Sequence, residues 1–401
     1  MNEVKIEKFD NQGRGICYVD SKITFVPNTL PGEIVNIKIT KESKKYNEAI
    51  VTDYLSVSKN RVESPCPYFS ICGGCELLHS KYEDTIKYKK EKLENIISKY
   101  ANIKSNIEVI PSDNILSYRN KITLKIINKK IGYYKSSSHN LIEIEKCLLA
   151  EPAINSFISD IKYLEIKNGE IVIRSNYNNE LLIWIKTKDN INPDVNYLKQ
   201  HHKIDGIVIN ENSFYGDTSF IEIINHQLFT VSYDSFFQIN RYICSKIFDL
   251  INNHIDNNEI ILDLYCGVGT LGINASKNAK KAFGIEIVKN AVLNAITNSK
   301  INKRDNIFYM LGDVSECLPK IKDKVDTIIV DPPRAGLDKI TKNTIINFKP
   351  SKIIYVSCDP MTLARDLKEL SVYYNVIDLK GLDMFPFTQH IESFVVLTKR
   401  D

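Results

Sequence analysis

The sequence contains no long uninterrupted apolar segment. Nowhere in its 401 residues do about 18 uncharged apolar residues follow one another, as a membrane-spanning helix would need. The first ten residues, MNEVKIEKFD, are charged and lack the apolar stretch of a signal peptide. Internal repeats and low-complexity segments are also missing from the sequence. We therefore expect a folded cytoplasmic protein that does not associate with a membrane.

Neither charge is in large excess, because 53 lysines and arginines stand against 49 aspartates and glutamates, for a net charge of +4. This balance permits an RNA partner but does not require one. Lysine-rich stretches such as KYKKEKLENIISK are interpreted as solvated faces. Disulfides are not expected among the nine cysteines of a cytoplasmic chain, so some of them are candidates for metal binding or catalysis.

The length favours two or three domains, of which the first is predicted over residues 1–58. Five short segments, VKIEKF, GICYV, ITFV, EIVNIKI and AIVTDYL, alternate or run apolar and are separated by turn sequences such as NQGRG and NTLPGE. This spacing predicts a small antiparallel β-barrel of the oligonucleotide-binding type. A β-domain without any ligand is the alternative.

The middle of the chain, residues 59–234, is predicted to be a mostly β domain that begins with a cysteine cluster. A helix is expected near residues 80–100, and its apolar face is available for packing on the C-terminal domain. The residues on that face are Ile86, Leu93, Ile96 and Ile97. The chain is then rich in strand patterns from about residue 108 onward.

Residues 235–401 show a different pattern, in which apolar runs alternate with helical stretches. The runs include EIILDLYC, KAFGIEI, VDTIIVDPP, SKIIYVSCD and FVVLTKR. Such alternation is typical of βαβ units, so a parallel, doubly wound, Rossmann-like sheet is predicted here. The fold class is therefore multidomain α/β.

A cofactor site is predicted where the segment ILDLYCGVGTLG leaves its strand. Gly267, Gly269 and Gly272 match the G-x-G-x-x-G spacing, and Glu286 ends the next strand, where an acid can bind a ribose diol. Asp313, after the third strand, could meet an adenine amino group. The glycines alone do not exclude a dinucleotide.

Three further residues lie at strand ends or beside a strand. Asp331 ends the fourth strand before two prolines that lock the turn, and Cys358 ends the fifth. The helix that follows Cys358 can favour a thiolate with its N-terminus. Glu392 lies just before the last apolar strand. The structural alternatives are a turn aspartate, a buried cysteine and a solvated glutamate, and His390 nearby is interpreted as structural.

A compact thiol group is formed by Cys66-x5-Cys72-x2-Cys75 in a loop rich in proline and glycine. Its spacing differs from the C-x3-C-x2-C of radical S-adenosylmethionine enzymes. Both an iron–sulfur cluster and a tetrahedral zinc site use such ligands. Three other cysteines are interpreted as small buried hydrophobes, namely Cys17, Cys244 and Cys317.

In order along the chain, FFQIN, LDLYCGVGTLG, GIEIV, VDPPRAG, VSCDPMTLARDL and QHIESFVVL resemble the motifs of the RNA 5-methyluridine methyltransferase family, which uses S-adenosylmethionine. The N-terminal segment resembles the RNA-binding TRAM domain. The cysteine pattern, with Cys147 as its fourth member, resembles the iron–sulfur site of the 23S ribosomal RNA branch. The likeness covers essentially the whole chain.

The resemblance implies a role for each matching residue. Cys358 would add to carbon 6 of a uracil that has left its stack, and Glu392 would remove the proton from carbon 5. The cofactor-binding positions would be Gln238, Tyr265, Glu286 and Asp331, with Thr270 and Asp313 as weaker candidates. The ligands of a 4Fe–4S cluster, or alternatively of zinc, would be Cys66, Cys72, Cys75 and Cys147.

The expected substrate is a uridine of 23S rRNA, with the tRNA T-loop uridine as the alternative. An N-methyltransferase acting on an exocyclic amine is disfavoured, because such sites usually place an aromatic residue where this chain has Arg334. An RNA-binding assembly factor without activity is disfavoured by the presence of Cys358, Glu392 and the cofactor motif together. A monomer is expected.

Overall fold

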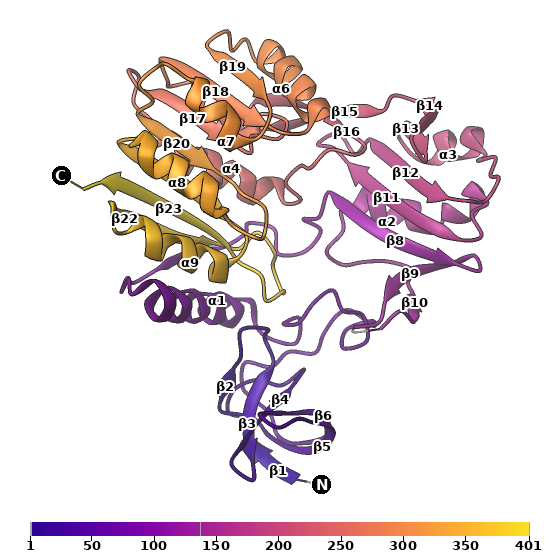
Figure 1. The fold of residues 1–401 in the computed structure, drawn as a ribbon. Helices are drawn as coiled ribbons and strands as arrows, with labels where there is room; N and C mark the ends of the chain where they lie inside the picture. The colour runs from indigo at the N-terminus through magenta and orange to yellow at the C-terminus, as the bar shows by residue number, and fades with distance from the viewer. Residues whose placement is uncertain (1, 137, 401) are drawn as a thin grey trace.

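The computed structural model describes residues 2–136 and 138–400. Three bodies follow one another along the chain (Figure 1). A small β-body at the N-terminus lies below, a central β-rich body lies to one side, and a larger α/β body contains the C-terminus. Within the described part of the chain, no helix is both long enough and apolar enough to cross a membrane.

The N-terminal body is a six-stranded sheet in the order β1-β5-β6-β4-β3-β2. One more strand forms than predicted, since VKIEKF is divided at Ile6, and β4 and β6 pair in parallel although an antiparallel barrel was expected. Cys17 is buried in the core with Val26 and Ile37, as predicted for that thiol. The strands are β1 (Asn2–Lys5), β2 (Lys8–Phe9), β3 (Gly15–Val19), β4 (Lys22–Val26), β5 (Ile34–Glu42) and β6 (Asn47–Ser56).

A loop leads from β6 into the helix α1 (Tyr82–Ile96), which ends in the π-helical turn η1 (Ile97–Ala101). Leu93, Ile96 and Ile97 are buried in one cluster with residues of the C-terminal body, and Ile86 packs against that cluster. The predicted apolar face thus covers the C-terminal body.

The central body is a seven-stranded sheet in the order β10-β9-β8-β11-β12-β13-β14. Helices α2 (Pro152–Ile158) and α3 (Val195–His201) and the turn η2 (Ile161–Leu164) contribute to its core. All neighbouring strands are antiparallel except β12 and β13. The strands are β8 (Lys121–Ile127), β9 (Lys130–Tyr134), β10 (Leu141–Glu143), β11 (Gly169–Ser175), β12 (Leu181–Thr187), β13 (Ile204–Ile209) and β14 (Asn212–Gly216).

The hairpin of β15 (Ser219–Ile224) and β16 (Gln227–Ser232) packs with the C-terminal body, although it precedes residue 235. Phe220, Phe229 and Val231 share a core with residues of that body. The side-chain amide oxygens of Asn298 and Asn302 accept the backbone N–H groups of Thr230 and Leu228 at 2.7 and 2.9 Å.

The C-terminal body is an eight-stranded sheet in the order β19-β18-β17-β20-β21-β23-β22-β7. The five strands from β17 to β21 are parallel, and β23 is antiparallel to β21. The strands are β7 (Glu108–Ile110), β17 (Ile260–Leu264), β18 (Lys281–Glu286), β19 (Ile307–Leu311), β20 (Thr327–Val330), β21 (Lys352–Ser357), β22 (Tyr374–Leu382) and β23 (Glu392–Lys399). The helical segments are α4 (Arg241–Asn252), α5 (Thr270–Ser276), α6 (Lys289–Ile301), α7 (Val314–Cys317), η3 (Leu318–Lys320), α8 (Lys339–Phe348) and α9 (Pro360–Leu370).

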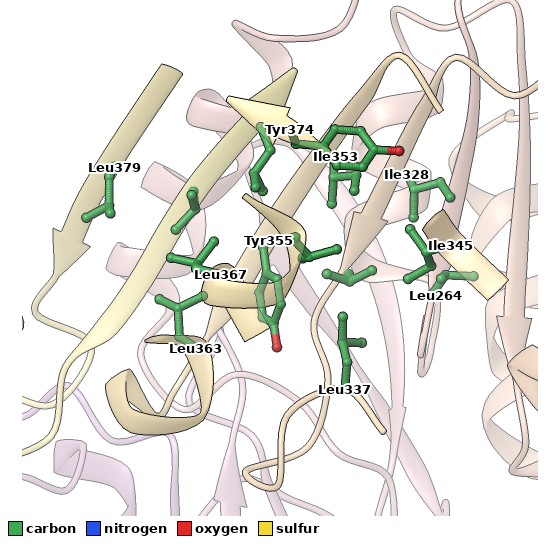
Figure 2. Close-up of a cluster of buried hydrophobic side chains, with 14 of the residues drawn as sticks. Leu264, Ile328, Leu337, Ile345, Ile353, Tyr355, Leu363, Leu367, Tyr374 and Leu379 are labelled. Carbon is green, nitrogen blue, oxygen red and sulfur yellow. The ribbon is translucent and has the colours of Figure 1, made fainter. Parts of the chain in front are cut away.

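Both faces of this sheet are buried, which explains the continuous apolar runs in the sequence. Along β21, Ile353 and Tyr355 point into one cluster, whereas Ile354 and Val356 point into the other. Figure 2 shows the first cluster, in which Tyr355 lies beside Leu363 and Leu367 of α9.

A buried ion pair joins α1 to the segment that precedes β23. The Nζ of Lys89 contacts Asp383 and also donates to the carbonyl of Phe385 at 2.9 Å, and both charged side chains have no exposed surface. Burial lowers the pKa of Lys89, although Asp383 opposes that shift. The hydroxyl of Tyr82 also donates to Asp383, at 2.8 Å. These two lysine-to-loop contacts contradict the interpretation of the lysine-rich stretch as a wholly solvated face.

We expect Lys89→Ala to lower the free energy of unfolding by about 3–5 kcal/mol, because it leaves the carboxylate of Asp383 buried without its cation. Urea denaturation measures the change. Lys87→Ala is the matched control, since Lys87 is exposed and lies 4.0 Å from Glu91 in a surface pair. The control should cost less than about 1 kcal/mol. Equal effects of the two variants would show that the ion pair contributes little.

Candidate active site

The register of β21 and β23 brings a thiol and a carboxylate together. Ser357, the last residue of β21, pairs with Ser393, the second residue of β23. Because the strands are antiparallel, Cys358 and Glu392 are the next residues at the same end of the pair. Side chains at opposed positions project to the same face of a sheet. The two predicted catalytic residues therefore lie at one edge of the sheet.

Asp331 joins this pair from the neighbouring strand β20. It directly follows Val330, and β20 pairs in parallel with β21, so its carboxyl group emerges at the same edge. The Nε2 of Gln238 donates to the Oδ2 of Asp331 at 3.3 Å. The carbonyl of Gln238 in turn accepts from the side-chain amide of Asn120 in the central body, at 3.1 Å. These two hydrogen bonds link the FFQIN segment to the end of β20 and to the central body.

Burial raises the pKa of each acidic group of the site. Burial raises the pKa of Glu392 well above its ordinary value, and the neighbouring Asp331 raises it further. Burial also raises the pKa of Asp331 to about 7. The pKa of Cys358 rises to about 11, mainly through burial and then through Glu392 and Asp331. Arg334 is a cation that opposes the shifts of both Cys358 and Glu392.

The expected help from the helix N-terminus is not found at Cys358. Asp359 caps α9 and accepts the backbone N–H groups of Met361 and Thr362 at 2.9 and 3.0 Å. The first-turn donors of the helix are therefore satisfied by a carboxylate, and Asp359 itself contributes to raising the pKa of Cys358. In the protein without substrate, the thiol form of Cys358 predominates at neutral pH.

The glycine-containing turn after β17 leaves room for a ligand beside the backbone. Gly267 has a φ of +54°, and a Cβ added there would meet no atom within 4 Å. Tyr265, which is not a glycine, also adopts a positive φ of +60°, a strained conformation that is common at functional sites. The hydroxyl of Tyr265 donates to Thr341 at 3.4 Å.

Glu286 is oriented across the turn by two backbone donors. Its carboxylate accepts from the N–H of Gly267 at 3.0 Å and from the N–H of Val288 at 2.8 Å. The two weaker candidates, Asp313 and Thr270, lie where helices begin. Asp313 caps α7 by accepting the N–H of Ser315 at 2.8 Å, and Thr270 is the first residue of α5.

Sequence reasoning missed Asp263, which lies within the apolar run of β17. Its Oδ2 accepts the N–H of Gly272 at 2.7 Å, and burial raises its pKa to about 8. A Cβ added to Gly272 would lie 2.8 Å from this oxygen. The third glycine of the motif is thus required where the helix packs closely on the strand. The sequence signal for Asp263 was the presence of an acidic residue within an otherwise apolar strand.

The four cysteines predicted as metal ligands line one cavity of about 660 Å³ between the Cys loop and the central sheet. None of them forms a disulfide. Burial raises the pKa of Cys72 and of Cys75, and neighbouring thiols contribute to both shifts. Within residues 2–136 and 138–400, no group of three or more Cys, His, Asp or Glu side chains is arranged to hold a metal ion. Neither the predicted 4Fe–4S site nor the zinc alternative is confirmed.

His390 lies beside the catalytic edge as a neutral side chain. Burial and then the cation Arg334 lower its pKa to about 4. The segment around it is held by α1, since the Nζ of Lys92 donates to the carbonyl and the Oε1 of Gln389 at 2.7 and 2.8 Å.

The chain is similar to known RNA methyltransferases. Residues 216–400 match the family model described as tRNA (Uracil-5-)-methyltransferase, and residues 2–52 match the TRAM domain. A protein of Thermotoga maritima named uncharacterized RNA methyltransferase is 33% identical, with 100% of each chain covered. A protein of the same description from Halalkalibacterium halodurans is 31% identical and covers 98% of this chain and 96% of its own.

Among solved structures, the tRNA (uracil-54, C5)-methyltransferase of Pyrococcus abyssi in complex with S-adenosyl-L-homocysteine superimposes with a TM-score of 0.82. It is 25% identical, and the match covers 99% of this chain and 100% of that one. The fold and the site thus define an RNA methyltransferase that depends on S-adenosylmethionine. The chain belongs to the RNA uracil-5-methyltransferase family and carries an N-terminal TRAM domain. The predictions of the TRAM domain and of the methyltransferase fold are confirmed.

Iodoacetamide should alkylate Cys358 about 100-fold more slowly at neutral pH than a cysteine of pKa 9.0, because a pKa of about 11 leaves little thiolate. The rate should rise about tenfold for each pH unit while the protein stays folded. Mass spectrometry of the peptide that contains Cys358 measures the rate. Glu392→Gln should lower the pKa of Cys358, whereas Glu83→Gln, which changes an exposed carboxylate on α1, should not. A fast reaction at pH 7 would contradict the proposed protonation of the thiol.

Proposed function

We propose that this protein transfers a methyl group to carbon 5 of a uridine in RNA, with Cys358 as the nucleophile and Glu392 as the base. The observation that carries this proposal is the pairing of Ser357 with Ser393, from which both side chains follow at one edge of the sheet. The family match supports the same chemistry. The reaction needs a soft nucleophile and a carboxylate next to one pyrimidine ring, and both are present here.

The steps at the protein side chains are as follows. The thiolate of Cys358 forms a bond to carbon 6, and the electron pair of the C5–C6 double bond makes carbon 5 nucleophilic. S-adenosylmethionine, when bound, would supply the methyl group to carbon 5, with the electron pair of the broken sulfur–methyl bond left on S-adenosylhomocysteine. Glu392 then accepts the proton of carbon 5, the double bond re-forms, and Cys358 leaves as a thiolate. One carboxylate accepts one proton, so Glu392 must be ionised when carbon 5 is methylated.

The cofactor would lie in the crevice at the carboxyl ends of β17, β18 and β20. Glu286 supports this position, because the N–H groups of Gly267 and Val288 hold its carboxylate beside the turn, where an acid can bind a ribose diol, and the space beside Gly267 is open. Tyr265 borders the same turn, and Gln238 and Asp331 close the crevice toward Cys358. Thr270 and Asp313 are the outer members of the proposed set.

We propose 23S rRNA as the substrate, on the basis of the TRAM domain together with the cysteine pattern. The T-loop uridine of tRNA is the second candidate, and the similarity to the Pyrococcus abyssi tRNA (uracil-54, C5)-methyltransferase favours it. Both candidates use the same chemistry at Cys358 and Glu392, so one trapping experiment can test the mechanism and compare the RNAs.

Glu392→Gln should accumulate a covalent protein–RNA adduct. The carboxylate that removes the proton from carbon 5 is missing in this variant, whereas Cys358 can still attack carbon 6. The variant is incubated with S-adenosylmethionine and with 23S rRNA or tRNA that lacks 5-methyluridine. A denaturing gel then shows the adduct, and its formation with one RNA identifies the substrate. Turnover should fall about 10²–10⁴-fold, as expected for the loss of a general base.

The double variant Glu392→Gln/Cys358→Ala is the control, and it should form no adduct and no 5-methyluridine. An adduct in the absence of Cys358 would contradict the assignment of the nucleophile. Normal turnover by Glu392→Gln would contradict the assignment of the base.

We further propose that Cys66, Cys72, Cys75 and Cys147 hold a 4Fe–4S cluster. Support comes from Arg119, whose guanidinium lies near Cys75 and Cys147 and whose buried Nε has no hydrogen-bond partner in the described structure. A buried cation of this kind needs nearby negative charge. Four thiolates around a cluster carry net negative charge, whereas four neutral thiols do not. The side chains would have to close on the cluster from their present positions.

Anaerobically purified protein should contain four iron atoms per chain and show visible thiolate–iron absorbance. Cys75→Ser should remove most of this iron, whereas Cys317→Ser should not, since Cys317 is a buried thiol of the C-terminal body. Metal analysis and absorbance are the measurements. A colourless protein with one equivalent of zinc would favour the tetrahedral zinc alternative.

A further inference from the structure

A second cavity, of about 540 Å³, lies where the TRAM domain meets the Cys loop. Its walls come from β6, from the turn after β4, and from the loop between Arg61 and His79. Pockets that bind small planar ligands have about this volume. The site residues of the methyltransferase described above do not line this cavity.

Aromatic rings form part of the walls. Tyr54 of β6 lines the cavity and has 41% of its surface exposed. Phe69 and His79 line it as well, and their ring centroids lie 5.2 Å apart with planes tilted by 32°. An exposed aromatic ring beside a cavity, such as that of Tyr54, offers a stacking surface for a base of unpaired RNA.

His79 is the most deeply buried side chain in the wall of this cavity. Only 2% of its surface is exposed, and neither ring nitrogen has a hydrogen-bond partner in the described structure. The Thr29 carbonyl is close enough to favour a proton on the ring, but burial and Arg61 outweigh it and lower the pKa of His79 to about 4. The ring is therefore neutral and has one donor and one acceptor nitrogen. Buried polar atoms are rarely left without a partner.

An ion pair and hydrogen bonds within the protein hold the rest of the wall in place without a ligand. The guanidinium of Arg61 binds Glu33 at 2.6 Å and also donates to the carbonyl of Asn28 at 2.8 Å. The same group lies 4.5 Å from the ring centroid of Tyr54, whose hydroxyl donates to Asn28 at 2.8 Å. The orientation of Tyr54 is thus fixed, which reduces the entropy lost when a ligand stacks on it.

The loop that carries His79 also contacts the segment before the catalytic strand. The N–H of Leu77 donates to the carbonyl of Phe387 at 3.0 Å. The carboxylate of Glu76 accepts the N–H of Gln389 at 3.0 Å, three residues before Glu392. The loop that lines the cavity therefore also holds the segment that leads into Glu392.

We propose that this cavity binds an unpaired nucleobase of the RNA substrate, which stacks on Tyr54 and hydrogen-bonds to His79, while the target uridine occupies the catalytic site. The proposal rests on the proposed function only in that it takes the substrate to be RNA. The nucleobase would form hydrogen bonds with the buried ring nitrogens of His79. The cavity would therefore contribute to RNA affinity and to the choice of site, and not to methyl transfer.

The test measures RNA binding in the full-length protein without S-adenosylmethionine, using short single-stranded RNA of mixed sequence and fluorescence anisotropy. Tyr54→Ala should weaken binding about 5- to 100-fold, the range expected for the loss of one stacked base. Tyr54→Phe keeps the ring and should bind within about twofold of the unmodified protein. His79→Phe keeps a ring but removes both nitrogens, and it should weaken binding as well.

Tyr18→Ala is the matched control, because Tyr18 is an exposed tyrosine of the same domain that does not line the cavity. Ultraviolet cross-linking of the same RNA should label the peptide that contains Tyr54 or Phe69. The proposal is wrong if Tyr54→Ala and Tyr18→Ala have equal effects, if His79→Phe binds normally, or if the RNA cross-links elsewhere. The binding assay contains no methyl donor, so its result does not depend on methyl transfer. A separate assay with S-adenosylmethionine tests the proposed function. Absence of 5-methyluridine in that assay would overturn the proposed function and leave the binding result unaffected.

Discussion

The antiparallel register of β23 against β21 is the constraint on which the catalytic arrangement depends. Side chains alternate along a strand, so a slip of one residue would turn Glu392 away from Cys358. The core prevents that slip, because Phe394 and Val396 belong to one cluster and Val395 and Leu397 to the other. The relative position of nucleophile and base is thus determined by apolar packing some distance from the reaction.

The burial that fixes this geometry also raises the free-energy cost of ionising the acids of the site, and substrate binding must lower that cost. Cys358, Asp331 and Glu392 are three acids in one poorly solvated place. Burial raises the pKa of each of them, Asp331 further raises that of Glu392, and both carboxyl groups raise that of Cys358. Arg334 is an exposed cation of the site that favours the charged forms. Methyl transfer needs both a thiolate and a carboxylate, so binding of a cationic cofactor and of RNA must change the balance. A methyl donor with a positive sulfonium group is suited to that task.

Much of the architecture could be predicted from the sequence because it follows from local patterns. Apolar runs that end in Gly267, Asp331 and Cys358 indicate strand ends, and parallel strands bring their carboxyl ends to one edge. The cap by Asp359 could also have been predicted, since an aspartate before proline is a common helix start. Recognising it would have removed the expectation of a thiolate stabilised by the helix.

Other features depend on contacts between segments far apart in the sequence, and no local pattern reports them. Lys89 looks like one lysine in a charged stretch, and only the approach of Asp383, 294 residues later, explains its burial. The hairpin at residues 219–232 has ordinary strand patterns, so its packing with the C-terminal body was not predictable from them. The arrangement of the four cysteines is equally non-local, because Cys147 reaches the cavity from a different part of the chain than Cys66.

These long-range contacts converge on one short segment, residues 383–391, which leads into Glu392. Helix α1 holds it through Lys89 and Lys92, the Cys loop holds it through Glu76 and Leu77, and Tyr118 of the central body donates to the carbonyl of Pro386 at 3.2 Å. Helix α1, the Cys loop and the segment that contains Tyr118 therefore bear directly on the position of Glu392. A loop supported from three sides loses little freedom when RNA binds, so binding energy remains available to orient the uridine. This arrangement shows how segments outside the C-terminal sheet contribute to the position of the proposed base.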